Sequence, residues 1–260
     1  MPPIKDKPLY IGNTAGRVLW KDFRKVVTLD TIFRQQGTDP NQVKFKRLLG
    51  NIRNANPTVD DWNLLMSRTY SNMDGTESNT FSSEIHLFPT NSLVNVHNRC
   101  MLKSLGIPIA RCVAEHTKNK DFSDADDDQL QQEVLLCPGQ RVMLTCNLWV
   151  EAGLVNGALG TVENIFFSDG SKPPQLPMYA TVSFDDYIGL PWDIRYPKIV
   201  PITPIARGNR KQIPLRMAWD LTIHKSQGLT LQRETIDIGI AERQGLTFTA
   251  ISRVKSIDGL

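Results

Sequence analysis

Residues 84–106 read EIHLFPTNSLVNVHNRCMLKSLG, and this stretch decides the fold class. The apolar residues of 84–89 predict a buried strand, and Thr90 with Asn91 predicts the N-cap of a helix. Apolar residues recur at helical spacing over 92–106, and Gly106 is the residue type that commonly ends a helix. A strand, a capped turn and a helix in this order form the basic element of α/β proteins. The sequence therefore predicts an α/β fold.

The chain before this stretch alternates between strand-like and helix-like patterns. Residues 22–36 carry a short β-branched run and predict a strand followed by a turn. Residues 41–53 predict an amphipathic helix with a basic side. Asp60 and Asp61 predict the N-cap of a second short helix, and the polar residues 71–83 predict a loop.

The chain after this stretch changes to short strands separated by turn signals, and such a set closes best as a small β-barrel. The expected strands lie at 140–147, 158–167, 178–184 and 196–203. From residue 215 the α/β character returns, with strands at 216–222 and 235–240 and a helix starting near Gly245. We therefore expect residues 21–133 and 215–260 to form one α/β domain, 134–214 to form an inserted barrel, and 1–20 to be an extension or the end of a preceding domain.

Composition excludes several classes of protein. The 260 residues are 40% apolar and 22% charged with a net charge of +3, which does not fit disorder. No apolar run is long enough to span a bilayer, so we expect no membrane partner. The weak positive charge permits a polyanionic partner without requiring one.

The cysteines and histidines do not predict a metal site. Zinc sites in sequence show paired Cys or His at short spacing, and this chain has no such pair. We expect reduced cysteines and no metal. The acidic stretch 121–128 predicts a solvated insertion, because it lacks the glycine and the terminal glutamate of a calcium-binding EF-hand loop.

The richest set of hydrogen-bonding groups lies in residues 215–231, LRMAWDLTIHKSQGLTL. An apolar run ends here in a polar turn from Thr222 to Gly228, and Gly228 lets the backbone approach a ligand closely. Such a turn at a sheet edge offers donors to phosphate groups. Taken alone, the turn is equally compatible with an ordinary polar surface loop.

Five blocks of sequence, in the right order, resemble the superfamily-one DNA helicases of the PIF type, relatives of RecD. TIHKSQGLTL resembles their motif V, TAISRVKSIDGL at 249–260 their motif VI, and IHLFPTNSLVNVHN at 85–98 their motif IV region. LDTIFRQQ at 29–36 is similar to the arginine-bearing segment that opens their second motor domain. CPGQRVMLTCN and LVNGALGTV, within 137–162, resemble the first strands of their inserted barrel.

The resemblance implies a RecA-like second motor domain with an inserted small β-barrel, and it assigns roles to residues at a nucleotide cleft. Arg253 corresponds to the motif VI arginine that reaches the γ-phosphate of ATP, and Arg34 to a second phosphate-reaching arginine. A guanidinium suits this task because it stays charged and binds phosphate oxygens bidentately. Gln35, Gln227 and Gly228 are expected near the nucleotide. The alternative for each arginine is an ordinary surface ion pair.

The resemblance also implies a track for single-stranded DNA. Thr90 and Asn91 would hold the DNA backbone from one segment, and Thr222, His224 and Lys225 from another. Contacts of this kind position a strand without reading its sequence. His224 as a general base is the rival interpretation, but the sequence offers no partnered nucleophile for it.

The phosphate-binding loop GxxxxGK[ST] and the acidic pair that holds magnesium do not occur in these 260 residues. ATP and Mg²⁺ are therefore expected only together with an N-terminal RecA-like half, supplied in cis or in trans. The resemblance implies the C-terminal half of an ATP-dependent 5′-to-3′ DNA helicase. It also implies roles in DNA repair, recombination and telomere maintenance, and a nuclear or mitochondrial location in a eukaryote or a cytoplasmic one otherwise.

The missing loop leaves two alternatives to this interpretation. One is a nucleic-acid-binding remnant of a helicase that cannot hydrolyse ATP alone, and the other is an inert gene product.

Overall fold

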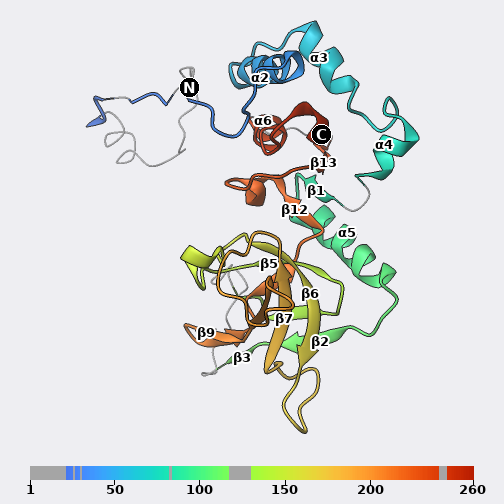
Figure 1. Cartoon of the computed structure of the whole chain (residues 1–260), viewed down its shortest axis with the longest axis vertical. Coiled ribbons are helices and arrows are strands. Elements are labelled where there is room, and N and C mark those ends of the chain that lie inside the picture. The colour runs from blue at the N-terminus through green and yellow to red at the C-terminus, as the bar shows by residue number, and fades with distance from the viewer. Residues whose placement is uncertain (1–21, 26, 30, 82–83, 117–129, 240–244) are drawn as a thin grey trace, which may run out of the picture. The chain divides into compact units, whose positions relative to one another are not determined.

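The computed structural model describes residues 22–25, 27–29, 31–81, 84–116, 130–239 and 245–260. These residues fall into two compact units, which we describe one at a time (Figure 1). Unit 1 contains the described parts of Met1–Phe81, Thr230–Glu234 and Arg243–Leu260, and unit 2 those of Ser82–Leu229 and Thr235–Glu242. The domain boundaries expected from the sequence stay a prediction. The expected N-terminal extension and the acidic stretch 121–128 lie outside the described residues.

Unit 1 is mainly helical. Its elements are α2 (Pro40–Arg53), α3 (Val59–Met66), α4 (Gly75–Asn79), α6 (Leu246–Ile251) and the 3-10 helix η3 (Ile257–Gly259). The side chain of Asp39 caps α2 by accepting a hydrogen bond from the backbone N–H of Gln42 at 3.0 Å. The apolar face of α2 buries Phe45, Leu48 and Leu49, and the helix packs against α6 and η3. The amphipathic helix predicted at 41–53 is confirmed.

A capping box starts α3. The hydroxyl of Thr58 accepts from the backbone N–H of Asp61 at 3.2 Å, and the Asp61 carboxylate accepts from the N–H of Thr58 at 2.9 Å. Asp61 also accepts from Asn51 at 2.7 Å, which ties α3 to α2. The second short helix is confirmed, but its N-cap is Thr58 rather than an aspartate.

Two local predictions in unit 1 are wrong. The described residues of 22–36 form no strand, and the side chains of Val27 and Leu29 are 85% and 86% exposed. A β-branched run becomes a strand only where a neighbouring strand takes its backbone groups, and no described strand pairs with it. The polar stretch 71–83 contains the short helix α4, because Asp74 caps it by accepting from the N–H of Glu77 at 2.7 Å.

A three-stranded sheet forms one part of unit 2. Its order is β12-β1-β13, with β1 at Ile85–Phe88, β12 at Asp220–Thr222 and β13 at Glu234–Ile236. The first residue of β13 belongs to unit 1 and the other two to unit 2. β1 and β12 run parallel, with His86 opposite Asp220 and Phe88 opposite Thr222. Both strands therefore end at the same sheet edge, where α/β proteins commonly bind ligands.

Helix α5 (Asn91–Ser104) leaves this edge directly after β1, and Thr90 caps it through the N–H of Leu93 at 3.4 Å. The strand, capped turn and helix predicted at 84–106 are thus confirmed. The buried side chain of Asn98 fixes α5 to β12. Its Oδ1 accepts from the N–H groups of Trp219 and Asp220, each at 3.2 Å, and its Nδ2 donates to the carbonyl of Asp220 at 3.1 Å.

The second part of unit 2 is a five-stranded antiparallel sheet with the order β11-β5-β6-β7-β8. Its strands are β5 (Arg141–Leu144), β6 (Leu159–Phe166), β7 (Tyr179–Phe184), β8 (Ile199–Ile202) and β11 (Leu215–Met217). β6 and β7 approach so closely that a Cβ at Gly160 would lie 2.7 Å from the carbonyl oxygen of Ser183, which requires glycine there. A buried apolar cluster lies under this sheet, including Val142, Val162, Val182 and Phe184.

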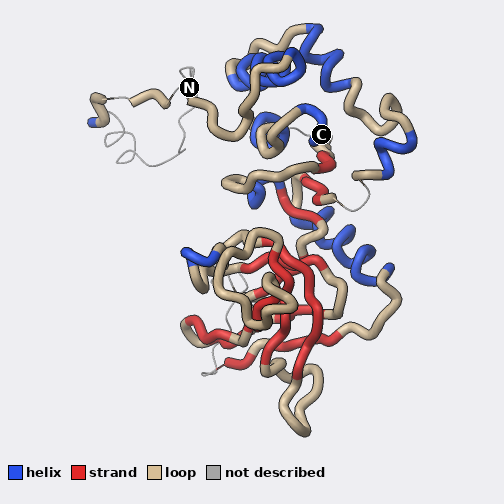
Figure 2. The backbone as a smooth tube through the Cα atoms, in the orientation of Figure 1, coloured by secondary structure: helices blue, strands red, loops and turns tan. Residues whose placement is uncertain are grey.

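The four strands predicted at 140–147, 158–167, 178–184 and 196–203 are confirmed, whereas the closed barrel is not. β11 and β8 are the two edges of the sheet and do not pair with each other in the described residues. The other strands of this region form a two-stranded sheet, β2-β4, and a three-stranded sheet with the order β3-β10-β9. Strands therefore predominate over helices in this region (Figure 2). The strands of these two sheets are β2 (Ala110–Val113), β3 (Glu115–His116), β4 (Glu133–Leu136), β9 (Ile205–Arg207) and β10 (Arg210–Gln212).

Among the described residues, no helix is both long and apolar enough to cross a bilayer. All four cysteines carry free thiols.

Candidate functional site

Unit 1 brings together the two arginines predicted to reach a phosphate. Arg34 donates from Nη1 to the carbonyl of Ser252 at 2.8 Å and from Nε to the hydroxyl of Thr230 at 3.0 Å. Its neighbour Gln35 is buried and donates from Nε2 to the carbonyls of Ser252 and Val254, at 3.2 and 2.8 Å. The segment at 34–35 is therefore fixed to the backbone on both sides of Arg253.

Arg253 follows α6 and lies against the last turn of that helix. It is only 9% exposed, and it donates from Nε to the carbonyl of Thr249 at 2.8 Å and from Nη2 to the hydroxyl of Ser252 at 2.7 Å. Burial lowers the pKa of Arg253, and the nearby charge of Arg34 lowers it further, whereas Glu234 raises it. A guanidinium has five N–H donors, and two of those of Arg253 have acceptors in the described residues. The remaining donors have no acceptor in the described residues.

A carboxyl group completes this arginine cluster, which we define as Arg34, Glu234 and Arg253. Glu234 is fully buried, and neither carboxyl oxygen has a hydrogen-bond partner in the described residues. Burial raises its pKa to about 8, against the opposing influence of the charges of Arg253 and Arg34. At neutral pH the carboxyl is thus largely protonated, and the cluster keeps a net positive charge. Sequence reasoning missed Glu234, because a single acidic residue at the start of a short strand carries no distinguishing pattern.

Unit 2 carries the residues predicted to hold a DNA backbone, at the edge where β1 and β12 end. Thr90 and Asn91 start α5 there, and both are exposed. The turn after β12 forms the 3-10 helix η2 (Ile223–Ser226), and the structure places η2 against β1. The parallel pairing of the strands thus brings the two predicted segments next to each other.

The residues of the second segment differ in exposure. Thr222 is only 5% exposed, and its hydroxyl accepts from the N–H of Lys225 at 3.4 Å, so it shapes the turn. His224, Gln227 and Gly228 are exposed, and Gly228 has a φ of +96°, a backbone conformation that favours glycine. The structure keeps Gln227 and Gly228 in unit 2, whereas Gln35 lies in unit 1.

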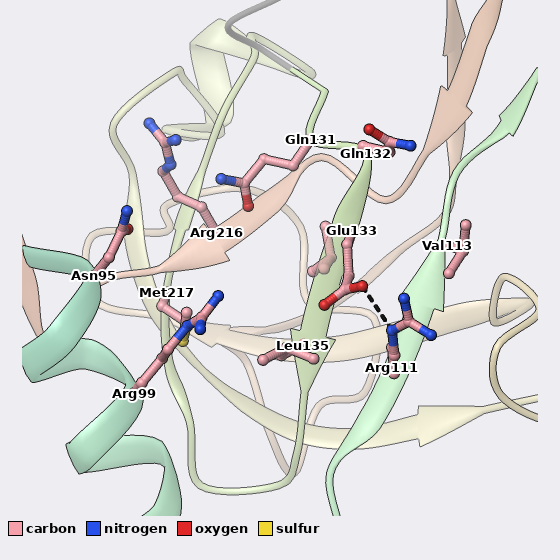
Figure 3. Close-up of a pocket in the computed structure, with 11 residues that line it drawn as sticks. Asn95, Arg99, Arg111, Val113, Gln131, Gln132, Glu133, Leu135, Arg216 and Met217 are labelled. Carbon is pink, nitrogen blue, oxygen red and sulfur yellow. Dashed lines mark hydrogen bonds and ion pairs between the residues drawn. The ribbon is translucent and has the colours of Figure 1, made fainter. Parts of the chain in front are cut away.

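A cavity of about 470 Å³ lies in unit 2 beside α5 (Figure 3). Asn95 and Arg99 extend into it from α5, and Arg216 extends from β11. On the other side, Arg111 of β2 donates to Glu133 of β4 at 2.6 Å. The lining is therefore polar and rich in arginine, a composition suited to anionic groups.

A smaller cavity of about 50 Å³ adjoins the large one, because both are lined by Asn95 and Arg216. Asn91, Thr222 and Lys225 line the small cavity. Together the two cavities lead from the predicted DNA-binding turns along α5. Sequence reasoning missed Asn95, Arg99 and Arg216. The available signal was the spacing of Asn91, Asn95 and Arg99, which places polar groups every fourth residue on one helix face.

Three tryptophans of unit 2 have rings that could stack with nucleic-acid bases, and these three differ in exposure. Trp219 is 8% exposed and packs with Leu102 and Cys137 in a core cluster, which explains it without a ligand. Trp149 is 44% exposed and Trp192 is 75% exposed.

Comparisons with known proteins relate this chain to one group of enzymes. The human protein named ATP-dependent DNA helicase PIF1 is 37% identical over 144 residues, which are 55% of this chain and 21% of the human protein. Among solved structures, a Bacteroides Pif1 helicase in complex with ADP-AlF3 and ssDNA shares 26% identity and a TM-score of 0.61, and the match covers 90% of this chain and 50% of that one. The chain is similar to the Pif1 DNA helicases in both sequence and fold.

Other Pif1 proteins show the same relation. A PIF7 helicase of Trypanosoma brucei is 31% identical over 160 residues, covering 50% of this chain and 16% of the relative. The Pif1 helicase of Candida albicans has the same fold at 24% identity, with a TM-score of 0.64 over 88% of this chain and 54% of that one. No protein-family profile matches the chain.

The resemblance to PIF-type helicases and the α/β helicase fold are thus confirmed. The matches span only about a fifth of the length of the curated relatives and about half of the solved Pif1 chains.

Proposed function

We propose that this chain forms the part of an ATP-dependent 5′-to-3′ DNA helicase that supplies phosphate-reaching arginines and a track for single-stranded DNA. The observation that carries the proposal is the arginine cluster. Arg34 and Arg253 come from opposite ends of the sequence, and the carbonyl of Ser252 joins their two segments. The similarity to Pif1 helicases supports assigning them to a nucleotide rather than to a surface ion pair.

The cluster fits the terminal phosphoryl group of a nucleoside triphosphate. Two guanidiniums lie together here, and a guanidinium is the side chain best suited to binding phosphate oxygens. In the described residues, the Glu234 carboxyl accepts no hydrogen bond from either of them. In phosphoryl transfer, arginines of this kind neutralise the charge that develops on the transferred group. A phosphate-binding loop and bound Mg²⁺ would neutralise the remaining charge, and that loop is not among these 260 residues. An N-terminal RecA-like half, in cis or in trans, would provide it.

The proposed DNA track runs along the edge where β1 and β12 end. Asn91 and Lys225 would contact the phosphodiester backbone from the small cavity, with Thr90 and His224 exposed beside them. Thr222 would act through the shape of the turn, because its side chain is buried. Gln35, Gln227 and Gly228 are proposed to relay the state of the nucleotide.

An ATPase assay tests the proposal. A fusion of this chain to the first motor domain of a Pif1 helicase should hydrolyse ATP with stimulation by single-stranded DNA. Arg253→Ala should reduce kcat by about 10³-fold, since arginine fingers are worth 10³ to 10⁵ in rate. Arg47→Ala is the matched control, because Arg47 is an exposed arginine of unit 1. Unchanged DNA-stimulated hydrolysis in Arg253→Ala would overturn the assignment.

A second function, binding of single-stranded nucleic acid by this chain without ATP hydrolysis, is favoured by the arginine-rich cavity beside α5. Fluorescence anisotropy of a labelled oligonucleotide with the chain alone tests it. Binding that weakens with salt supports this function, and no binding at low salt contradicts it.

A further inference from the structure

Two histidines and one aspartate meet in unit 2, and the proposed function assigns no role to any of them. His86 lies on β1, His97 on α5 and Asp220 on β12, and we call them the His-His-Asp cluster. Nδ1 of His97 lies 2.8 Å from Oδ2 of Asp220, and Nδ1 of His86 lies 3.5 Å from Oδ1. One side-chain nitrogen or oxygen of each residue lies within 4.8 Å of those of the other two.

The fold itself creates this arrangement. His86 and Asp220 are directly opposite in the parallel pairing of β1 with β12, so their side chains project from the same face of the sheet. α5 covers that face, and the two imidazole rings have centroids 5.0 Å apart. Asn98, the residue after His97, holds the backbone N–H and carbonyl of Asp220. The three side chains are therefore positioned by packing and by a buried hydrogen-bond network.

The buried carboxylate of this cluster belongs to Asp220, and one of its two oxygens lacks a hydrogen bond within the part of the chain that the structure describes. Asp220 is 0% exposed, yet its Oδ1 has no hydrogen-bond partner in the described residues. A buried carboxylate is costly unless it is paired, hydrogen-bonded or bound to a metal. The 3.5 Å separation from His86 is too long to serve as a good hydrogen bond. An atom aimed into the cluster is thus left without a partner.

The donor set selects a class of cation. Two imidazole nitrogens and one carboxylate oxygen are the protein ligands of zinc enzymes with an open fourth position. Magnesium and calcium prefer oxygen ligands, so they fit this set poorly. Tetrahedral zinc with bonds of about 2.0–2.1 Å holds its ligand atoms about 3.4 Å apart. The two separations, 2.8 Å to Oδ2 and 3.5 Å to Oδ1 of Asp220, lie on either side of that value, and the ligand atoms of all three residues lie within 4.8 Å of one another. Side-chain rotations that bring one carboxylate oxygen and both imidazole nitrogens to about 3.4 Å from one another would complete the site.

Solvent reaches the two histidines of the cluster. The side chains of His86 and His97 are 20% and 38% exposed, whereas that of Asp220 is fully buried. A cation can therefore enter past the imidazoles, and a water molecule can occupy the fourth position. Chloride or phosphate cannot take the same place without facing the Asp220 carboxylate.

We propose that His86, His97 and Asp220 form a zinc-binding site in unit 2, with water as the fourth ligand. The cation joins β1, β12 and α5 at one point, and these elements flank the two turns that begin at Thr90 and Thr222. This site would fix the spacing of those turns. Its existence does not depend on the proposed helicase function.

Isothermal titration calorimetry on the full chain tests the site. The protein is first stripped with a chelator, and Cys100→Ser serves as the background because Cys100 is the exposed cysteine. We expect one equivalent of Zn²⁺ to bind, and Co²⁺ to give the intense visible absorption of a tetrahedral complex. His97→Ala should weaken Zn²⁺ binding by at least 100-fold, since it removes a ligand rather than a supporting group.

His116→Ala is the matched control, because it removes an exposed histidine of the same unit outside the cluster. It should leave Zn²⁺ binding unchanged. His86→Ala provides a second test if His97→Ala fails to fold, and circular dichroism establishes folding for each variant. Zn²⁺ binding of equal strength in the parent and in both cluster variants would overturn the proposal. Absence of Zn²⁺ binding at a concentration of about 100 µM would overturn it too.

Discussion

Single residues in unit 1 determine how the arginine cluster responds to pH. Glu234 is buried without a hydrogen bond, beside two guanidiniums. Arg253 donates to two acceptors of its own helix region rather than to this carboxyl. The Glu234 carboxyl is therefore uncharged at low pH, and it attracts the two guanidiniums electrostatically only when it ionises.

Glu234 should make folding stability depend on pH. Its pKa in the folded chain is about 8, above the ordinary value of 4.5, so the folded state binds the extra proton between these values. The stability contributed by the protonated group is full below about pH 4.5 and is lost as pH rises through about 8. The free energy of unfolding should fall by roughly 1 kcal/mol per pH unit in this window relative to Glu234→Gln.

Urea unfolding of both proteins at pH 5, 6.5 and 8 measures this difference. The glutamine variant cancels contributions from all other titrating groups. If the free energy of unfolding changed with pH by the same amount in both proteins, the Glu234 carboxyl would already be ionised in the folded chain, and the prediction would be wrong.

Residue-level features were the hardest to predict from sequence. Arg34 and Arg253 were predicted because they lie in two long motifs, and the structure places them together. Glu234 and the His-His-Asp cluster were missed because their partners come from distant strands and helices. Sequence spacing records neighbours along the chain, whereas these contacts exist only after β1 and β12 have paired.

At the scale of elements, the attachment of α5 to β12 depends on one amide side chain. Asn98 makes three hydrogen bonds to the backbone of Trp219 and Asp220, and it is 2% exposed. These bonds provide hydrogen-bond partners for two N–H groups and one carbonyl of the backbone at Trp219 and Asp220. Buried backbone groups without a partner destabilise a fold strongly.

Asn98→Leu should therefore lower the free energy of unfolding by about 2–4 kcal/mol, because it leaves three backbone groups unpaired. The midpoint of urea unfolding measures the loss, provided that the slope is unchanged. Asn95→Ala on the same helix is exposed and should change stability by less than about 0.5 kcal/mol. Equal effects of the two substitutions would contradict this role for Asn98.

Elements with strong patterns were predicted well, and those that depend on distant partners were not. The helices at 40–53 and 91–104 have clear apolar spacing and capping residues, so their local sequence is sufficient. The strand expected at 22–36 has the right composition but no described partner. The closed barrel expected from four strands depends on how two sheet edges meet, which local sequence does not encode.

At the scale of the molecule, the net charge is only +3, but several arginines lie together around the cavity beside α5. Arg99 and Arg216 face one cavity that adjoins the proposed DNA-binding turns. Binding of a polyanion should depend on these few groups rather than on overall charge.

Arg99→Ala should weaken binding of a single-stranded oligonucleotide by the chain alone, by several-fold at low salt. The slope of log K against log salt concentration should become shallower by about 0.7, the value for one phosphate contact with a single strand. Fluorescence anisotropy over a salt series measures both effects. Arg195→Ala removes an exposed arginine that is paired with Asp193, and it should leave the slope unchanged. If the parent, Arg99→Ala and Arg195→Ala all showed the same dependence of binding on salt, the cavity beside α5 would not be part of the nucleic-acid interface.

The parallel pairing of β1 with β12 also bears on the order in which the protein acquires its shape. Most of unit 2, including all of β5 to β8, lies between these two strands along the chain. During synthesis β1 leaves the ribosome long before β12, so β1 has no β12 to pair with while β5 to β8 are already able to pair with one another. The sheet edge that carries the proposed DNA track is therefore among the last parts of unit 2 to be assembled.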